Sequence, residues 1–396
     1  MARLRVRMVQ RDPNEAHRAS TPLELFFDLT FVAAVAQAGS GLEQGLVGGD
    51  ARRVLIAYPL VFFAIWWAWI NFTWFASAYD VDDVPYRLAV LVQMTGVLIL
   101  AAGTTRALEH WNFDLMVLGY VVMRLAMVSL WLRAAIADPT GRRSALRYAA
   151  GIALVQVGWT LSLLLPIDAR VPVYAILLAG ELSVPIWAEA AGRTSWHPGH
   201  IAERYSLFTI IVLGEVVLAA SAGVHTALVG RAPLYELLWI IVGGLLAVFS
   251  MWWLYFDMPS ARIVQTVRRE FSERLSGAFA WGYGHYFIFA SAAATGAGLT
   301  VAIKQATGHS LLSTREAAFV ETVPIALYLF AVWLVHRPYK PKGRWRNVGA
   351  PLGACGIVVA SFTPEPVLTA GLIMVALVVI NGVVYRGATE RVTLES

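Results

Sequence analysis

Residues 23–37 read LELFFDLTFVAAVAQ, an apolar stretch that carries two acidic side chains. Glu24 and Asp28 are four residues apart, so a helix places them on one face. A membrane-buried helix tolerates such groups only where they face other protein or a water-filled cavity. The stretch therefore predicts a membrane helix with one side turned toward neighbouring helices.

The composition supports this interpretation. Of 396 residues, 58% are hydrophobic and 14% are charged, against roughly 25% charged in an ordinary soluble domain. A single cysteine, Cys355, excludes an intrachain disulfide and a cysteine-based zinc site. The chain contains no phosphate-binding loop, dinucleotide fingerprint or nucleophile elbow. We therefore predict no metal, no cofactor and, despite the net charge of +5, no nucleic-acid partner.

Twelve segments are apolar over about the 20 residues that a membrane span needs. They lie at about 23–46, 54–78, 87–108, 113–137, 146–165, 171–191, 205–224, 234–256, 275–301, 317–335, 348–362 and 367–385. The eleventh is short and rich in glycine. The predicted fold class is an all-α polytopic membrane protein of about twelve transmembrane helices, with no room for a soluble domain.

The basic residues predict the orientation, because lysine and arginine near span ends are retained in the cytoplasm. With the amino terminus inside, the inside segments hold 23 of them and the outside segments hold 7. This distribution predicts cytoplasmic termini. Residues 1–22 lack the apolar core of a signal peptide and are expected to stay as a basic cytoplasmic segment, with 387–396 as a cytoplasmic tail.

A shift of about 187 residues aligns three features of the chain with later ones. The aligned pairs are Asp28 with Glu215, WWAWIN from Trp66 with WWLYFD from Trp252, and Arg87 with Arg274. Because six spans separate each pair, the shift predicts two parallel six-helix halves, 23–198 and 199–386. The alternative interpretation is chance recurrence in a membrane protein rich in tryptophan.

Four longer motifs carry a family resemblance. They are LELFFDLTFVAAVAQ at 23–37, HIAERYSLFTIIVLGEVVLA at 200–219, WWLYFD at 252–257 and YGHYFIFASAAATGAG at 283–298. In this order, across most of the chain, they resemble the low temperature requirement A (LtrA) family of bacterial membrane proteins. The resemblance implies a polytopic protein of the bacterial inner membrane, named for a cold-growth phenotype. It supplies no biochemical activity.

Four ionisable residues share the middle of the predicted membrane. At 1.5 Å per helical residue, Glu215 lies about 15 Å into a hydrocarbon core of about 30 Å. Arg124, Glu181 and His285 lie at about the same depth in their own spans. Each such group costs on the order of 2.5–3.5 kcal/mol when it faces lipid. We therefore expect these side chains to face one another or a hydrated cavity.

Arg124 stays charged at any relevant pH, so it needs an ionised partner among Glu181, Glu215 and Asp28. The remaining carboxylates are then available to bind protons. The predicted substrate- or proton-binding residues are Glu24, Asp28, Arg124, Glu181, Glu215, Asp257 and His285, with Trp66, Trp67, Trp252 and Trp253 as an aromatic wall. The alternative is structural: a buried pair that fixes helix register, an acid favoured at a helix start, and tryptophans that pack or mark the interface.

Two classes of function fit these residues. The first is a proton-coupled secondary transporter of a small solute, in which Glu215 and Asp28 exchange protons and Arg124 is a counter-ion or substrate clamp. The second is an intramembrane enzyme or lipid-handling protein that uses the same acids and His285 as acid and base. A sensor or assembly factor is a third class. We favour the transporter, with membrane lipid and an unidentified solute or lipid as partners; the oligomeric state is open, and a homodimer is compatible with the sequence.

Overall fold

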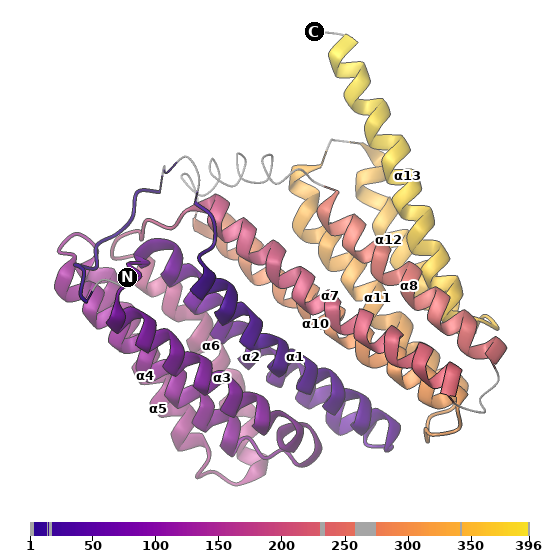
Figure 1. The fold of residues 1–396 in the computed structure, drawn as a ribbon, viewed down its shortest axis with the longest axis horizontal. Coiled ribbons are helices and arrows are strands. Elements are labelled where there is room, and N and C mark those ends of the chain that lie inside the picture. The colour runs from indigo at the N-terminus through magenta and orange to yellow at the C-terminus, as the bar shows by residue number, and fades with distance from the viewer. Residues whose placement is uncertain are drawn as a thin grey trace. The chain divides into compact units, whose positions relative to one another are not determined.

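The computed structural model describes residues 4–13, 15, 18–229, 234–257, 275–340 and 343–394. Every regular element among these residues is helical, and they contain no strand (Figure 1). The all-α prediction is confirmed. Some residues used for the sequence predictions lie outside the described part of the chain, namely Arg274 of the proposed repeat and the basic residues Arg3, Arg231, Arg262, Arg268, Arg269 and Lys342.

Each predicted segment falls mainly within one α-helix. The first six are α1 (Pro22–Val47), α2 (Ala51–Tyr79), α3 (Val84–His110), α4 (Asp114–Ala137), α5 (Arg142–Ser162) and α6 (Ile167–Glu189). The others are α7 (Pro198–Val229), α8 (Leu234–Phe256), α10 (Leu275–Ala306), α11 (Thr314–His336), α12 (Arg344–Val359) and α13 (Pro366–Leu394). Two short 3₁₀ turns, η1 (Arg337–Tyr339) and η2 (Ala360–Phe362), follow α11 and α12.

Ten of these helices are long and apolar enough to cross a membrane, fewer than the twelve predicted spans. Helix α5 has sufficient length, but it begins with Arg142 and Arg143 and carries Arg147 one turn later. Helix α12 has 16 residues, which at 1.5 Å each reach about 24 Å. Helix α5 is too polar, and helix α12 is too short, to meet the requirement for a membrane span.

Local side-chain hydrogen bonds define where two helices begin. The Thr21 hydroxyl accepts from the Glu24 backbone N–H at 3.2 Å, and the Glu24 carboxylate accepts from the Thr21 N–H at 2.8 Å. This reciprocal pair is a capping box, and it starts α1. At α3, the Asp83 side chain accepts from the backbone N–H of Tyr86. Local hydrogen bonds with Thr21 therefore hold Glu24 at the start of α1.

The chain divides into two compact units, each of which is described by itself below. The first unit consists of Met1–Ala38 and Leu60–Tyr205, and the second consists of Gly39–Pro59 and Ser206–Ser396. In the first unit α3 packs on α4, α4 on α5 and α5 on α6 (Figure 1). In the second unit α10 packs on α11, α11 on α12, α12 on α13 and α13 on α8.

Glycine allows very close helix contact in both units. A Cβ atom added at Gly119 of α4 would lie 2.5 Å from the Gly96 carbonyl oxygen and 2.5 Å from the Leu100 amide nitrogen of α3. In the second unit, a Cβ at Gly298 of α10 would lie 2.7 Å from the Val320 carbonyl oxygen of α11. Backbones that approach this closely leave room only for a hydrogen atom, as is common where membrane helices pack.

Candidate functional site: a buried ion pair beside an apolar pocket

Arg124 of α4 and Glu181 of α6 form a buried ion pair in the first unit. Arg124 Nη2 lies 3.3 Å from Glu181 Oε2, and the two residues are 3% and 2% exposed. The same Nη2 donates to the Tyr120 hydroxyl at 2.9 Å, and Trp67 Nε1 donates to Glu181 Oε2 at 2.7 Å. Of the three carboxylates considered for Arg124, the one paired with it is thus Glu181.

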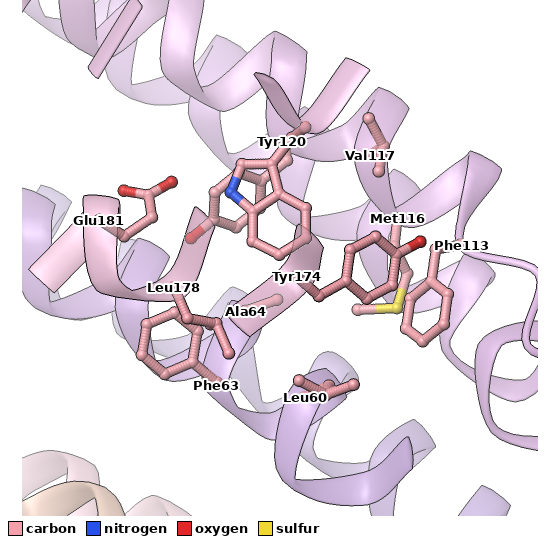
Figure 2. A pocket seen from close by; sticks show the side chains of 11 residues that line it. Leu60, Phe63, Ala64, Phe113, Met116, Val117, Tyr120, Tyr174, Leu178 and Glu181 are labelled. Atoms are coloured by element: carbon pink, nitrogen blue, oxygen red, sulfur yellow. The ribbon is translucent and has the colours of Figure 1, made fainter. Parts of the chain in front are cut away.

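A pocket opens beside this pair, with about 520 Å³ of space between the atoms, its open side included. Helices α2, α4, α5 and α6 contribute to its wall. Most of the lining is apolar, and the members that matter here are Phe63, Phe113, Tyr120, Trp159, Tyr174 and Glu181. Figure 2 shows the Glu181 carboxylate at one end of a wall of aromatic rings. Concave, mainly apolar sites with a few polar groups are typical of small-molecule binding.

Two polar groups of this pocket retain unused hydrogen-bonding capacity. Oε2 of Glu181 accepts from Arg124 and Trp67, whereas no described residue donates to Oε1. The indole N–H of Trp159 is buried and has no hydrogen-bond partner among the described residues. The pocket therefore offers one charged acceptor and one donor to a compound that is otherwise held by aromatic surfaces.

Glu24 and Asp28 belong to a separate polar network in the first unit, around the start of α1. Both side chains are 1% exposed, and Arg204 of α7 joins them. Arg204 Nε donates to Asp28 Oδ2 at 2.8 Å, and Nη1 lies 3.3 Å from Glu24 Oε1. Trp69 Nε1 donates to Asp28 at 2.7 Å, and His200 Nε2 lies 3.1 Å from Glu24 Oε1. The acidic face of α1 thus meets protein rather than lipid.

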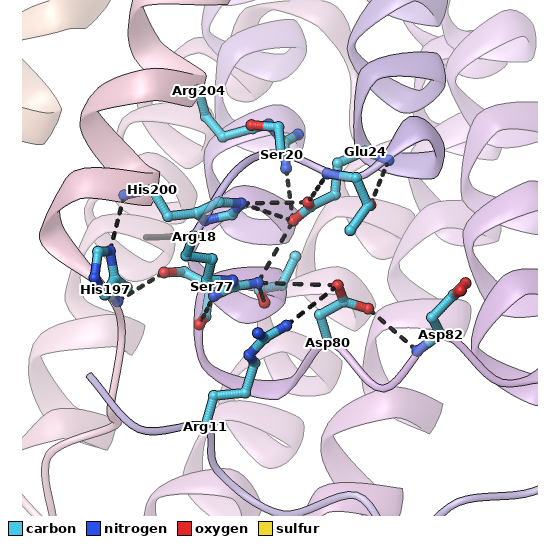
Figure 3. A network of polar contacts seen from close by, with 12 residues as sticks. Arg11, Arg18, Ser20, Glu24, Ser77, Asp80, Asp82, His197, His200 and Arg204 are labelled. Atoms are coloured by element: carbon cyan, nitrogen blue, oxygen red, sulfur yellow. Dashed lines mark hydrogen bonds and ion pairs between the residues drawn. The ribbon is translucent and has the colours of Figure 1, made fainter. Parts of the chain in front are cut away.

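The network extends to residues that precede α1 and follow α2 (Figure 3). Arg18 donates to the backbone carbonyls of Ala76 and Ser77, and its Nη2 lies 3.8 Å from Glu24 and 4.0 Å from Asp80. Asp80 is 8% exposed. Burial, reinforced by the nearby Glu24 carboxylate, raises the pKa of Asp80 to about 6, although Arg18 opposes this shift.

Asp80 is expected to make the stability of the protein depend on pH. Because its pKa rises from 3.8 to about 6 on folding, the folded state binds more protons than the unfolded state between these values. Stability therefore falls as the pH rises from about 4 to about 6, by at most about 3 kcal/mol. Detergent-induced unfolding measured from pH 4 to pH 7 tests this. Asp80→Asn should flatten the curve, and an unchanged slope in that variant contradicts the assignment.

The other predicted site residues lie in the second unit. His285 of α10 is fully buried, with its Nε2 3.0 Å from the Tyr255 hydroxyl and its Nδ1 2.8 Å from the Trp281 carbonyl oxygen. Glu215 of α7 is half-buried, and Asp257 is exposed just after α8. Arg124 and Glu181 therefore meet within one unit, and a single site that includes Glu215 and His285 stays a prediction.

The predicted aromatic wall has members in different surroundings. Trp66 and Trp67 are each 1% exposed in the first unit, with ring centroids 5.4 Å apart. Trp252 and Trp253 of the second unit are 47% and 53% exposed. The first pair packs inside the unit, and Trp67 also supports Glu181. A wall shared by all four rings stays a prediction.

Glu321 of α11, in the second unit, is a buried acid that is absent from the predicted site residues. Its side chain is 0% exposed, and neither carboxyl oxygen has a hydrogen-bond partner among the described residues. Gly298 of α10 leaves the space that it occupies, because a Cβ there would lie 2.6 Å from Glu321 Oε2. The signal was available in the sequence: an acid at the fifth residue of the predicted span 317–335.

Comparisons with known proteins agree with the motifs. The family model described as bacterial low temperature requirement A protein (LtrA) matches residues 19–381. An uncharacterized protein of Rhizobium meliloti (strain 1021) is 27% identical over 295 residues, which cover 72% of this chain and 69% of that protein. No solved structure matches the chain.

Proposed function

Because the chain belongs to the bacterial low temperature requirement A (LtrA) family, whose description names no activity, we propose a function from the pocket beside Glu181. The proposal is a proton-coupled membrane carrier for a small, mainly apolar compound that bears a cationic or hydrogen-bond-donating group. The observation that carries it is a buried carboxylate at the wall of an aromatic pocket, whose Oε1 accepts no hydrogen bond from the residues that the structure describes. Aromatic faces and a carboxylate both attract a cation.

Glu181 and Glu321 receive different roles in this proposal. Protonating Glu181 would leave Arg124 as an uncompensated buried charge, a change that typically costs about 3–5 kcal/mol. Glu181 therefore binds the solute and keeps its charge. Asp28 is likewise held by Arg204 and Trp69. Glu321 has no cationic partner among the described residues, so it is the better proton carrier, with the half-buried Glu215 as a second candidate.

The acid–base enzyme is less well supported. Its proposed base, His285, is fully buried, and both ring nitrogens are already engaged by Tyr255 and Trp281. A general base must reach the proton that it removes, either directly or through one water. Among the described residues, Glu181 contributes the pocket's one carboxylate.

We also propose the inner-membrane location, the cytoplasmic termini and the duplication. The 23 to 7 distribution of basic residues supports the orientation. The duplication is supported by the shared packing order of α3–α4–α5–α6 and α10–α11–α12–α13. The close-contact positions Gly96 and Gly119 also precede Gly298 and Glu321 by the same 202 residues. This offset differs from 187, which is compatible with an insertion between the compared helices.

Ethidium, a planar aromatic cation with N–H donors, is a suitable probe for the pocket. Glu181→Gln is expected to weaken its binding to the purified protein at least about tenfold, because a hydrogen bond to a charged group contributes about 1.5–3 kcal/mol. Fluorescence anisotropy measures this directly. The matched control is Glu109→Gln, which removes a partly exposed acid outside the pocket and should leave binding unchanged. Equal affinities in both variants would exclude the pocket.

Coupling is tested separately in proteoliposomes that contain a trapped pH-sensitive dye. Ethidium movement should be accompanied by a pH change in the wild type. Glu321→Gln should retain ethidium binding and lose the pH change. If the variant still moves protons with ethidium, Glu321 is not the proton carrier, and Glu215→Gln becomes the next variant to compare.

A further inference from the structure

A second pocket lies in the second unit, where α11 ends and α12 begins. It contains about 370 Å³ of space between the atoms, its open side included. Its basic and polar lining residues are Lys340, Arg346 and Asn381, accompanied by Trp333 and Trp345. The rest of the lining is apolar and includes Leu254 and Leu377. The pocket is therefore amphipathic, unlike the pocket beside Glu181.

The chain around this pocket concentrates positive charge. Residues 337–346 read RPYKPKGRWR, with five basic residues and no acid. This segment begins in the last three residues of the candidate span Thr314–Tyr339 and continues beyond it. Clusters of basic residues next to a membrane span attract anionic lipid headgroups, each residue contributing to the attraction. The position thus combines a lipid interface with local positive charge.

Hydrogen bonds hold the basic residues of the pocket in place. Trp345 Nε1 donates to Asn381 Oδ1 at 2.7 Å, and Trp333 Nε1 donates to the Arg346 carbonyl oxygen at 2.6 Å. Arg346 Nη1 donates to the Lys340 carbonyl oxygen at 3.3 Å. Trp333 thereby fixes the backbone at Arg346, and Arg346 in turn holds the backbone at Lys340. The arrangement is built by α11, α12 and α13 together rather than by one exposed loop.

The Arg346 guanidinium of the pocket is incompletely satisfied among the described residues. Arg346 Nε is buried and has no hydrogen-bond partner among the described residues. Burial lowers the pKa of the Lys340 amino group, while the nearby Asp257 carboxylate opposes this effect. A bound anion would supply the missing acceptor and stabilise the charged form of the lysine. Phosphate oxygens suit both groups, because a guanidinium and an ammonium are the usual partners of phosphate.

We propose that this pocket binds the phosphate-bearing headgroup of an anionic phospholipid. Lys340 and Arg346 contact the phosphate, and the apolar lining with Leu254 and Leu377 receives the first part of an acyl chain. The apolar lining residues would make no favourable contact with a free phosphate ion, whereas they suit an acyl chain. We therefore infer that the occupant is a lipid. The site lies in the second unit and is independent of the carrier function proposed above.

The test uses the full-length protein purified in detergent, with lipids that share their acyl chains. Native mass spectrometry and thermal unfolding compare dioleoyl phosphatidylglycerol with dioleoyl phosphatidylcholine. We expect retained phosphatidylglycerol and a raised Tm with that lipid only. Lys340→Gln and Arg346→Gln should each weaken its binding at least tenfold. The control is Arg344→Gln, which removes the same charge from an exposed residue of α12 outside the pocket.

Each contrary result has a distinct meaning. Equal weakening by all three variants would mean diffuse attraction to a basic surface and would overturn the pocket. Stabilisation by inorganic phosphate as strong as by phosphatidylglycerol would mean a free-anion site and would overturn the lipid. Equal retention of both lipids would overturn the proposal as a whole. Arg346→Lys, which keeps the charge, controls for loss of folding and should bind more tightly than Arg346→Gln.

Discussion

Replacing Asp28 with asparagine is expected to lower the free energy of unfolding by about 3–5 kcal/mol. Asp28 is 1% exposed, and its carboxylate accepts two hydrogen bonds from the Arg204 guanidinium and one from Trp69. The asparagine would keep the shape and remove the charge. Arg204, 0% exposed, would then depend on Glu24 alone, at 3.3 Å. The loss arises from an uncompensated buried charge rather than from one missing contact.

Unfolding by sodium dodecyl sulfate, followed by circular dichroism, measures this loss. The matched control is Asp82→Asn, which breaks an exposed pair with Arg87 and should cost about 1 kcal/mol or less. The double variant Asp28→Leu with Arg204→Met should recover part of the stability, since an apolar pair replaces both charges, although Glu24 loses Arg204 and the Trp69 N–H loses its acceptor. Similar losses for Asp28→Asn and Asp82→Asn would contradict the buried network.

The second large effect is expected from Gly119→Ala, at the contact of α3 and α4. The added methyl group would lie 2.5 Å from backbone atoms of Gly96 and Leu100, which cannot yield without moving a helix. Overpacking of this kind costs about 1–3 kcal/mol and occasionally more. We expect the upper part of that range, seen as a lower unfolding midpoint and a smaller fraction of folded protein after purification.

The control for Gly119→Ala is the same substitution at Gly214 of α7. A Cβ there meets no described atom within 4 Å. Alanine is a better helix former than glycine by roughly 0.5–1 kcal/mol, so Gly214→Ala should be neutral or slightly stabilising. If both variants behave alike, the close approach of α3 and α4 is not what limits stability.

Hydropathy predicts the helices of this chain well, because a bilayer leaves few alternatives to long apolar helices. Each predicted segment falls mainly within a helix, and the errors concern which helices can span. Helix α5 was included although Arg142, Arg143 and Arg147 occupy its first turns, and α12 was included although it has only 16 residues. Composition identified the fold class, whereas local charge and length decide the number of spans.

Side-chain partners were harder to predict, because they depend on packing between distant segments. The need of Arg124 for a carboxylate follows from charge alone, yet the choice of Glu181 depends on how α4 meets α6. The positions of Arg18 and Arg204 near predicted span ends indicate cytoplasmic charges, yet both are buried in the network with Glu24. A basic residue at a span end looks the same in sequence whether it faces water or a neighbouring carboxylate.

The ion pair between Asp28 and Arg204 also has a consequence for biogenesis, since its members are 176 residues apart. A ribosome that adds about 5–20 residues per second needs about 10–35 s to travel from one to the other. During that interval α1 must be accommodated while Asp28 lacks Arg204 as its partner. Trp69, whose indole donates to Asp28, is synthesised 41 residues after Asp28. The buried pair of Asp28 and Arg204 can therefore form only after the seventh helix has been synthesised.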